Sequence, residues 1–142
     1  MIPEDPAFIL SSSLVAAAYE HLQSLLRFPP VTLGSANPPR KNGVYAFRQE
    51  GEILYVGEAS SPSGLRGRIL NKHLAGDEGH VLQNLFALSH PDRVARRDHM
   101  KTVIRVQWVE VPDSLLASVV EKLAIAGLAP PLNKAVQKRS FR

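Results

Sequence analysis

The chain has 142 residues and a hydrophobic fraction of 44%, which predicts one folded domain and excludes an intrinsically disordered chain. It contains no cysteine, which excludes disulfide scaffolds, thiolate zinc sites and thiol nucleophiles, and which suits the reducing cytoplasm where we expect the protein to act. The formal charge of +4 is compatible with an acidic partner such as nucleic acid.

The first forty residues predict a helical extension followed by a linker. Apolar residues recur with helical spacing after three serines at 11–13, any of which can cap a helix that runs to about Arg27. The apolar run follows Glu4 and Asp5 rather than basic residues, so we expect no signal peptide, and no stretch reaches the ~20 apolar residues of a membrane span. Residues 31–42 predict an extended connector.

Beyond the connector the pattern predicts strands and helices in turn. Two runs rich in β-branched and aromatic residues, at 44–48 and 53–56, flank a glycine-containing turn and predict an antiparallel hairpin. The elements expected after the hairpin are helices over 65–74, from Val81 to before His90, and over 92–99, then a third strand over 102–109 and a last helix over 114–127. This order predicts an α+β fold, with a small three-stranded, mainly antiparallel sheet flanked by helices and an extra N-terminal helix.

We divide the chain into three parts. Residues 1–40 form the N-terminal helical extension and linker, residues 41–134 the main domain, and residues 135–142 a basic C-terminal tail. Basic side chains gather in two groups, which are Arg93, Arg96, Arg97 and Lys101, and Lys134, Lys138, Arg139 and Arg142. These groups are either phosphate-binding surfaces or solvated basic surfaces without a ligand.

The predicted hairpin brings two tyrosines close together. With the turn near 49–51, Tyr45 on the first strand and Tyr55 on the second pair across or nearly across the hairpin and share one face. A tyrosine on a strand is often simply a half-buried amphipathic residue. Gly43 and Gly57 are unusual within strands, however, and indicate the close approach of another backbone or of a ligand.

The helix after the hairpin carries two arginines and a histidine. Leu65 and Ile69 face the core, which puts Arg68 at the edge of the buried stripe and leaves Arg66 more exposed. An arginine beside a sheet can present its guanidinium to a phosphate. His73 follows Arg68 by five residues, or about 140° on a regular helix. It therefore joins Arg68 only if the helix bends or unwinds, and is otherwise a surface histidine.

Two polar residues near the C-terminus have both functional and ordinary interpretations. Glu121 is the only acid after Asp113, and the helical pattern permits an ordinary surface position. A single carboxylate beside a cleft could instead hold one hard divalent cation with water completing the shell, which is how Mg²⁺ usually binds. Asn133 could bond the backbone and fix the tail, or could contact DNA.

Together these segments resemble the GIY-YIG nuclease superfamily, over about residues 41–134. The matching segments are Gly43-Val44-Tyr45, Tyr55-Val56-Gly57, Leu65-x-x-Arg68, His73, and Glu121 through Pro130 to Leu132-Asn133. The superfamily includes repair nucleases, homing endonucleases and some restriction enzymes. The two tripeptides at this separation, followed in order by the arginine helix and the Glu-to-Asn segment, are more specific than either tripeptide alone.

The resemblance implies a divalent-metal-dependent endonuclease that hydrolyses phosphodiester bonds in DNA. It implies that Tyr45 activates or holds the attacking water, that Tyr55 completes the hydrogen-bond network, and that Arg68 binds the scissile phosphate. His73 would join this catalytic set, and Glu121 would ligate Mg²⁺ or Mn²⁺. The residues expected to contact nucleic acid are Arg66, Lys72, Asn133 and Lys134.

Some interpretations remain open at this stage. Glu58 stands where many relatives carry lysine or a small polar residue, and it could repel a phosphate or help to hold the metal. One alternative function is a catalytically inactive nucleic-acid-binding module in a DNA repair or mobile-element complex. Another is an unrelated α+β interaction protein. A protein partner or a homodimer is compatible with each of these.

Overall fold

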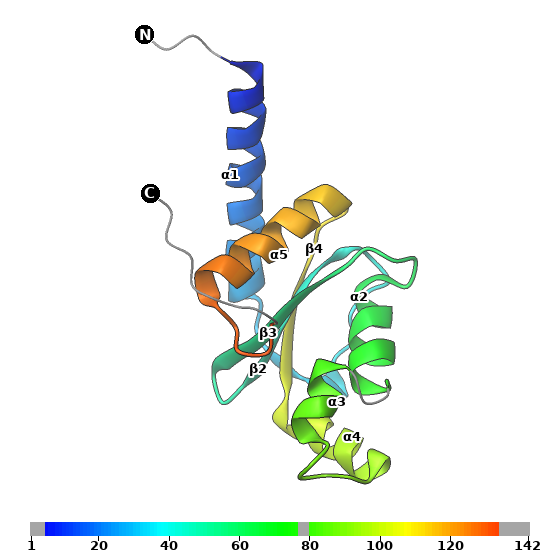
Figure 1. Cartoon of the computed structure of the whole chain (residues 1–142). Coiled ribbons are helices and arrows are strands. Elements are labelled where there is room, and N and C mark those ends of the chain that lie inside the picture. Colours follow the sequence, from blue (N-terminus) through cyan, green and yellow to red (C-terminus); the bar gives the residue numbers. More distant parts are fainter. Residues whose placement is uncertain (1–4, 77–79, 134–142) are drawn as a thin grey trace.

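The computed structural model describes residues 5–76 and 80–133, which fold around one antiparallel sheet (Figure 1). Its strands are β1 (Val31–Thr32), β2 (Gly43–Gln49), β3 (Glu52–Ala59) and β4 (Arg105–Glu110), in the order β1-β4-β2-β3. The α+β class is therefore confirmed, but the predicted number of three strands is wrong. The fourth strand is β1, in which Val31 pairs with Val106. Two residues are too few to produce an alternating pattern in the sequence.

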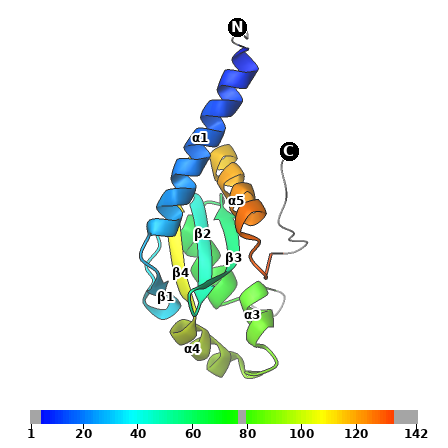
Figure 2. The same ribbon diagram turned by 90° about the vertical axis from the view of Figure 1, so that its left-hand side faces the viewer.

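Helices cover both faces of this sheet (Figure 2). They are α1 (Pro6–Arg27), η1 (Leu33–Ser35), α2 (Gly64–Arg66), η2 (Gly67–Leu74), α3 (Val81–Phe86), α4 (Arg93–Val103) and α5 (Ser114–Leu128). Here η1 is a 3₁₀-helix and η2 a π-helix. One apolar cluster joins the sheet to α1 and α5, and a second joins it to α2, η2, α3 and α4 on the opposite face.

Strand β2 supplies residues to both clusters. It lies between β3 and β4, so both of its faces are covered. Val44 and Ala46 point to the layer of α1 and α5, whereas Tyr45 and Phe47 point to the layer of η2 and α3. All four side chains are fully buried. The alternation follows from the two-residue period of a strand and puts Tyr45 at the centre of one layer.

The hairpin between β2 and β3 forms as predicted. Its turn residues Glu50 and Gly51 both have positive φ, at 52° and 83°. That pair of conformations makes a two-residue turn whose twist matches the twist of the flanking strands, and glycine adopts it without a steric penalty.

Two predicted boundaries are wrong. Helix α1 begins at Pro6 rather than at the serines at 11–13, because the Asp5 carboxylate accepts a hydrogen bond from Ala7 N at 2.9 Å and caps the first turn. The strand predicted over 102–109 begins at Arg105, because α4 continues to Val103. The last helix is confirmed, with Asp113 as its N-cap. None of the helices in the described part of the chain is long and apolar enough to cross a bilayer.

Candidate active site

The two predicted tyrosines share one face of the hairpin. In the observed register Tyr45 lies opposite Gly57 and Phe47 lies opposite Tyr55, so the tyrosines are diagonal neighbours. Their ring centroids are 6.3 Å apart. Tyr45 is fully buried and Tyr55 is half-buried. The pair therefore runs from the core toward the outer edge of β3, which has no strand beyond it among the described residues.

Gly57 leaves the space that the ring of Tyr45 occupies. A Cβ atom at position 57 would lie 2.5 Å from Cζ of Tyr45 and 3.0 Å from Cε2 of Tyr55. At Gly43 the close neighbours are the carbonyl of Val109 and the Leu65 side chain. The predicted close approach of a backbone is therefore present at Gly43, whereas at Gly57 the approaching group is an aromatic ring and neither a backbone nor a ligand. No larger residue fits at position 57 while Tyr45 keeps this position.

The π-helix η2 brings Arg68 and His73 to the same phenol. Ala75 N donates to Leu70 O at 3.0 Å, a bond that spans five residues rather than four. Residues five apart then lie on one side of the helix, which is the unwinding that the sequence required for His73 to join Arg68. His73 Nε2 lies 2.8 Å from Tyr45 Oη, and Arg68 Nε donates to the same oxygen at 3.4 Å.

His73 is a buried neutral imidazole. Its side chain is 2% exposed, and burial, together with the positive charge of Arg68, lowers its pKa to about 3. Because Arg68 donates to Tyr45 Oη, the phenol can donate its own proton to His73 Nε2. The imidazole then carries its proton on Nδ1, which has no hydrogen-bond partner among residues 5–76 and 80–133. Tyr45 and His73 thus form a directed donor–acceptor pair.

Both phenols stay protonated at neutral pH. Burial and the neighbouring Tyr55 raise the pKa of Tyr45, and the hydrogen bond and charge of Arg68 only partly oppose this rise. Burial also raises the pKa of Tyr55. The bond to Tyr45 raises the pKa of Arg68, which keeps the guanidinium charged. A tyrosinate is therefore not the resting state of this site.

Glu121 approaches the site from the opposite face of the sheet. It lies on α5, and its negative charge raises the pKa of Tyr45 and of Tyr55. Its side chain is 12% exposed and bonds Lys122 Nζ at 2.6 Å, whereas the Lys122 side chain is 70% exposed. The carboxylate is thus held near the phenols, and its cationic partner is free to turn toward solvent.

Glu58 forms a second carboxylate beside Glu121. Burial first, and then the charge of Glu121, raises the pKa of Glu58. The described residues contain no group of three or more histidine or acidic side chains that could enclose a metal ion. One or two carboxylates with water are nevertheless the usual share of a protein in binding Mg²⁺. The Lys122 ammonium lies against one of these two carboxylates, so a bound cation there would have to replace it.

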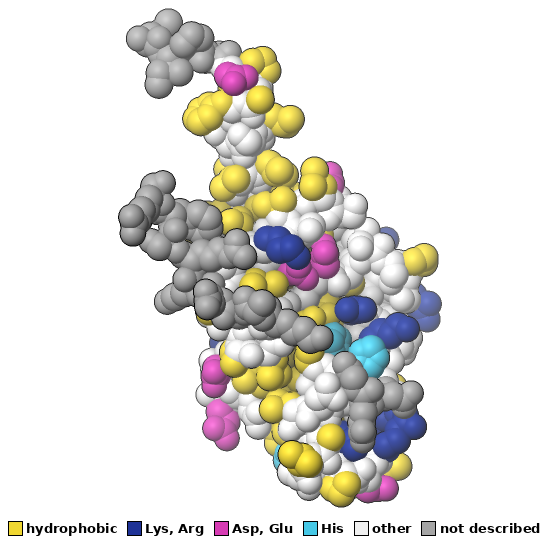
Figure 3. Space-filling view, viewed as in Figure 1, with side chains coloured by type: hydrophobic (Ala, Val, Ile, Leu, Met, Phe, Trp, Pro, Cys, Tyr) yellow, Lys and Arg dark blue, Asp and Glu magenta, His cyan; other side chains and the backbone are white. Residues whose placement is uncertain are grey.

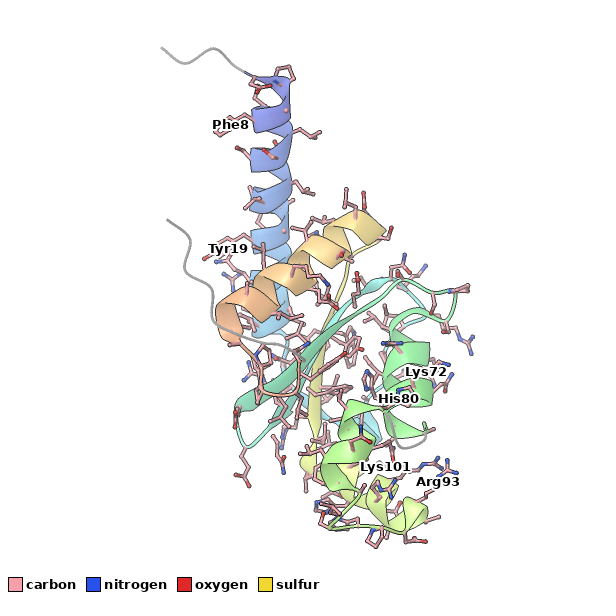
Figure 4. The ribbon with its side chains drawn as sticks, in the orientation of Figure 1. Phe8, Tyr19, Lys72, His80, Arg93 and Lys101 are labelled. Carbon is pink, nitrogen blue, oxygen red and sulfur yellow. The ribbon has the colours of Figure 1, made fainter. Side chains whose placement is uncertain are left out.

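Three of the residues expected to contact nucleic acid have defined positions. The Asn133 side chain accepts from Val56 N at 3.0 Å and donates to Val56 O at 2.9 Å, so it closes the outer edge of β3 as a short strand would. Arg66 is half-buried and its Nη1 donates to Asn37 Oδ1 at 2.7 Å, whereas Arg68 is exposed, so the predicted order of exposure of the two arginines is wrong. Lys72 is exposed on η2 (Figure 4). Lys134 lies outside the described residues.

The basic group on α4 is only partly available to a ligand. Arg96 is 1% exposed and donates to the carbonyls of His90 and Pro91 and to Gln83 Oε1. The phosphate-binding interpretation is therefore wrong for Arg96, which stabilises the turn between α3 and α4. Arg93 and Lys101 are exposed on the same helix (Figure 4). Lysine and arginine side chains gather on the half of the molecule that carries η2 and α4 (Figure 3).

Sequence reasoning missed one residue that positions the site. The fully buried Gln83 donates from Nε2 to the carbonyls of His73 and Leu74, at 3.2 Å and 2.8 Å. It therefore fixes the end of η2 where His73 meets Tyr45. No local signal identified it, because a glutamine on a short helix is usually solvated.

When this chain is compared with protein-family models, with curated proteins and with solved structures, nothing matches it.

Proposed function

We propose that this protein is a divalent-metal-dependent DNA endonuclease, as its resemblance to the GIY-YIG superfamily implies. The observation that carries the proposal is the convergence of Arg68 and His73 on the phenol oxygen of Tyr45. A second phenol and a carboxylate of α5 lie within electrostatic reach of that oxygen. These residues are distant in the chain, and packing alone does not require a guanidinium, an imidazole and two phenols on one face of a sheet.

Arg68 is suited to binding the scissile phosphate. Its side chain is exposed, yet its Nε atom is anchored on Tyr45. A guanidinium has five N–H donors, so the group can hold the phenol and bind phosphate oxygens at the same time. The fixed charge would stabilise the negative charge that develops on the phosphate as water attacks.

Tyr45 and His73 are suited to moving a proton away from the attacking water. Both groups are buried in the resting chain, so water has to enter beside Oη first. The phenol would then accept a proton from that water while its own proton passes to His73 Nε2, 2.8 Å away, which with a pKa of about 3 would hold the proton only in transit. Tyr45 remains neutral throughout, which agrees with its raised pKa. The bond from phosphorus to O3′ breaks, the leaving oxygen takes a proton from solvent, and the product carries a 5′-phosphate.

Glu121, assisted by Glu58, would hold the divalent cation. When bound, such a cation stabilises the charge on the leaving oxygen. The cation could bind only after Lys122 moves, because the Lys122 ammonium forms an ion pair with Glu121 and has to turn away first. Its high exposure makes that movement inexpensive.

The test is a nicking assay on supercoiled plasmid with Mg²⁺ or Mn²⁺ and with an EDTA control. We expect the parent to nick the plasmid only with metal, and Glu121→Gln to lose activity while its circular dichroism and DNA affinity are retained. Glu110→Gln, at an exposed position on β4, is the matched control and should cut like the parent. Cleavage by Glu121→Gln at the parental rate would refute the metal assignment.

A nucleic-acid-binding module without catalysis, within a DNA repair or mobile-element complex, is the second candidate. The observation that favours it is the ion pair between Lys122 and Glu121, which neutralises the carboxylate. Plasmid binding with no nicking in either metal, for the parent and for Lys122→Met alike, would establish this candidate in place of the first.

A further inference from the structure

The first half of α1 extends beyond the rest of the molecule (Figures 1 and 2). The described residues 5–13 are all exposed, and the first buried residue of the helix is Ala18. Only the second half of α1 packs on the domain, through residues such as Ala18 and Leu25. The helix has 22 residues, so its free part contains about three turns at 3.6 residues per turn.

This free part is apolar and uncharged. Its large exposed side chains are Phe8, Ile9, Leu10 and Val15, with Phe8 68% and Leu10 72% exposed, and Tyr19 is exposed just beyond it. From Pro6 to Tyr19 the sequence has no charged residue. A helix of three turns without tertiary contacts is only marginally stable in water, and an exposed apolar surface of this size marks an interaction site.

An apolar groove lies beside these side chains. It has a volume of about 580 Å³ and is lined by Ser11, Ser12, Val15, Ala16 and Tyr19 of α1 and Leu123 of α5. Three of the six lining residues are serine or alanine, so a second helix could approach closely. Leu115, at the start of α5, is also exposed. Hydrophobic side chains run along α1 and onto α5 in Figure 3.

The chemistry of this surface favours a protein as its partner. DNA and anionic lipid surfaces are bound through lysine and arginine. Helix α1 has neither before Arg27, and its charged residue before that point is Glu20. The surface carries both a protruding apolar helix and a groove that fits one, and two copies would meet without charge repulsion. We propose that the partner is a second copy of this chain, bound through antiparallel packing of the two α1 helices.

The spacing along α1 defines the symmetry of this dimer. If Phe8 of one copy enters the groove of the other near Ala16, the reverse contact forms at the same time. Ser12, midway between positions 8 and 16, then lies at the two-fold axis. An interface of this isologous kind is the commonest in homodimers. The proposal is independent of the nuclease function.

The apolar area of the groove side of α1 sets how strong the dimer can be. A buried aromatic side chain covers ~150–250 Å², and Phe8 and Tyr19 are each more than half exposed. Val15 lies on the same side of the helix as Phe8 and Tyr19, so these three side chains contribute roughly 300–400 Å² per copy before the serines and alanines of the groove are included, whereas Leu10, two residues from Phe8, lies on the other side. A standard interface buries about 800 Å² per partner.

The first experiment measures the mass of the full chain in solution by sedimentation equilibrium over a range of concentrations. We expect about twice the 15.6 kDa of one chain, and a monomer for the double variant Phe8→Glu/Leu10→Glu. Leu88→Glu, at a 98% exposed site at the end of α3, is the matched control and should remain dimeric. All these side chains are exposed, so the circular dichroism of the variants should equal that of the parent.

The second experiment locates the axis by disulfide formation, since the chain has no native cysteine. A disulfide requires Cα atoms about 4.4–6.8 Å apart, so Ser12→Cys should crosslink to its copy on mild oxidation. Ser24→Cys is the control on the same helix. Twelve residues at 1.5 Å each place it roughly 18 Å from the axis, and it should remain uncrosslinked.

Three results would overturn the proposal. The first is a parent chain that remains monomeric at every concentration. The second is a dimer that persists in Phe8→Glu/Leu10→Glu. The third is crosslinking of Ser12→Cys no faster than that of Ser24→Cys. A monomeric parent that binds phosphatidylcholine vesicles in flotation would assign the surface to lipid instead.

Discussion

The two layers on either side of the sheet are built on the same strands but contain different kinds of side chain. On the side of η2 and α3, the inward residues of β2 are Tyr45 and Phe47, and a π-helix and a buried histidine surround them. On the side of α1 and α5, the inward residues are Val44 and Ala46, which belong to an aliphatic cluster. The buried Gln107 pairs with Ala46 and donates to the carbonyls of Leu26 and Phe28 at the end of α1. One layer therefore contains a polar network around a phenol, and the other is mainly aliphatic, with its polar contacts where the sheet meets the end of α1.

This difference identifies where the candidate site depends on exact packing. The η2 layer is fixed by hydrogen bonds at Tyr45, His73 and Gln83, each of which needs its partner in place. The α5 layer contributes Glu121 from its rim, where the partner of this carboxylate is the exposed Lys122. We expect substitutions in the first layer to have large effects and those at the rim of the second to have small ones.

The largest effect should come from Arg68→Ala. Loss of the guanidinium removes the charge that would stabilise the phosphate, and a lost donor of this kind typically reduces kcat by ~10²–10³-fold. Arg66→Ala is the control from the same helical segment, because Arg66 bonds Asn37 rather than a phenol. Single-turnover nicking assays measure both rates, and equal losses in the two variants would remove the special role of Arg68.

The next effect concerns the pH dependence of stability. The pKa of His73 is about 3 in the folded chain, below the usual ~6.5 of the unfolded chain. The unfolded chain therefore binds more protons between these values, and this contribution to stability is complete above pH ~6.5 and is lost as pH falls toward 3. At pH 4 we expect a loss of about 3 kcal/mol that His73→Gln does not show.

Urea unfolding of both proteins at pH 7 and pH 4 checks this prediction. The quantity of interest is the difference between their free energies of unfolding at the two pH values, because the other titrating groups are shared. Parallel pH profiles for the parent and His73→Gln would show that the imidazole is not held neutral by the fold.

A smaller effect is expected at Gly57. In Gly57→Ala the added methyl group collides with the ring of Tyr45, and overpacking of this kind costs about 1–3 kcal/mol. Gly127→Ala, in α5, has nothing within 4 Å of the added Cβ and should instead stabilise the chain by ~0.5–1 kcal/mol. Thermal unfolding separates the two, and the same sign for both would contradict the packing at Tyr45.

The smallest effect is expected at the rim of the second layer. Lys122→Met removes the ammonium from Glu121, and an exposed ion pair contributes ~0.2–1 kcal/mol. The Mg²⁺ concentration that gives half-maximal nicking should therefore fall about 1.4- to fivefold. Lys101→Met, on the distant α4, should leave it unchanged. A higher Mg²⁺ requirement in Lys122→Met would mean that the lysine assists the site.

Local sequence signals were sufficient where a single element decides the structure. The hairpin follows from two β-branched and aromatic runs around Gly51, and its pairing brings Tyr45 and Tyr55 onto one face. The last helix follows from the Asp113 cap and the apolar pattern after it. In both cases the interactions that determine the element lie within about fifteen residues of one another.

Features that depend on distant partners could not be predicted. The π-helix follows from packing of η2 on Tyr45 and Gln83. The spacing of a regular α-helix, which was all that the sequence offered, puts Arg68 and His73 on different sides of the helix. The buried state of Arg96 depends on carbonyls at the end of α3. The charge coupling of Glu58 to Glu121 depends on α5 lying along β3, which neither segment encodes by itself.

The contact between Gly57 and Tyr45 also constrains how this sequence can evolve. A side chain can enter position 57 only after the phenol at position 45 has gone, because both would occupy one volume. The reverse order passes through a destabilised intermediate. In a set of descendants of this chain, therefore, a non-glycine residue at position 57 should occur together with a small residue at position 45, and the pair would record which lineages have given up the chemistry of the phenol.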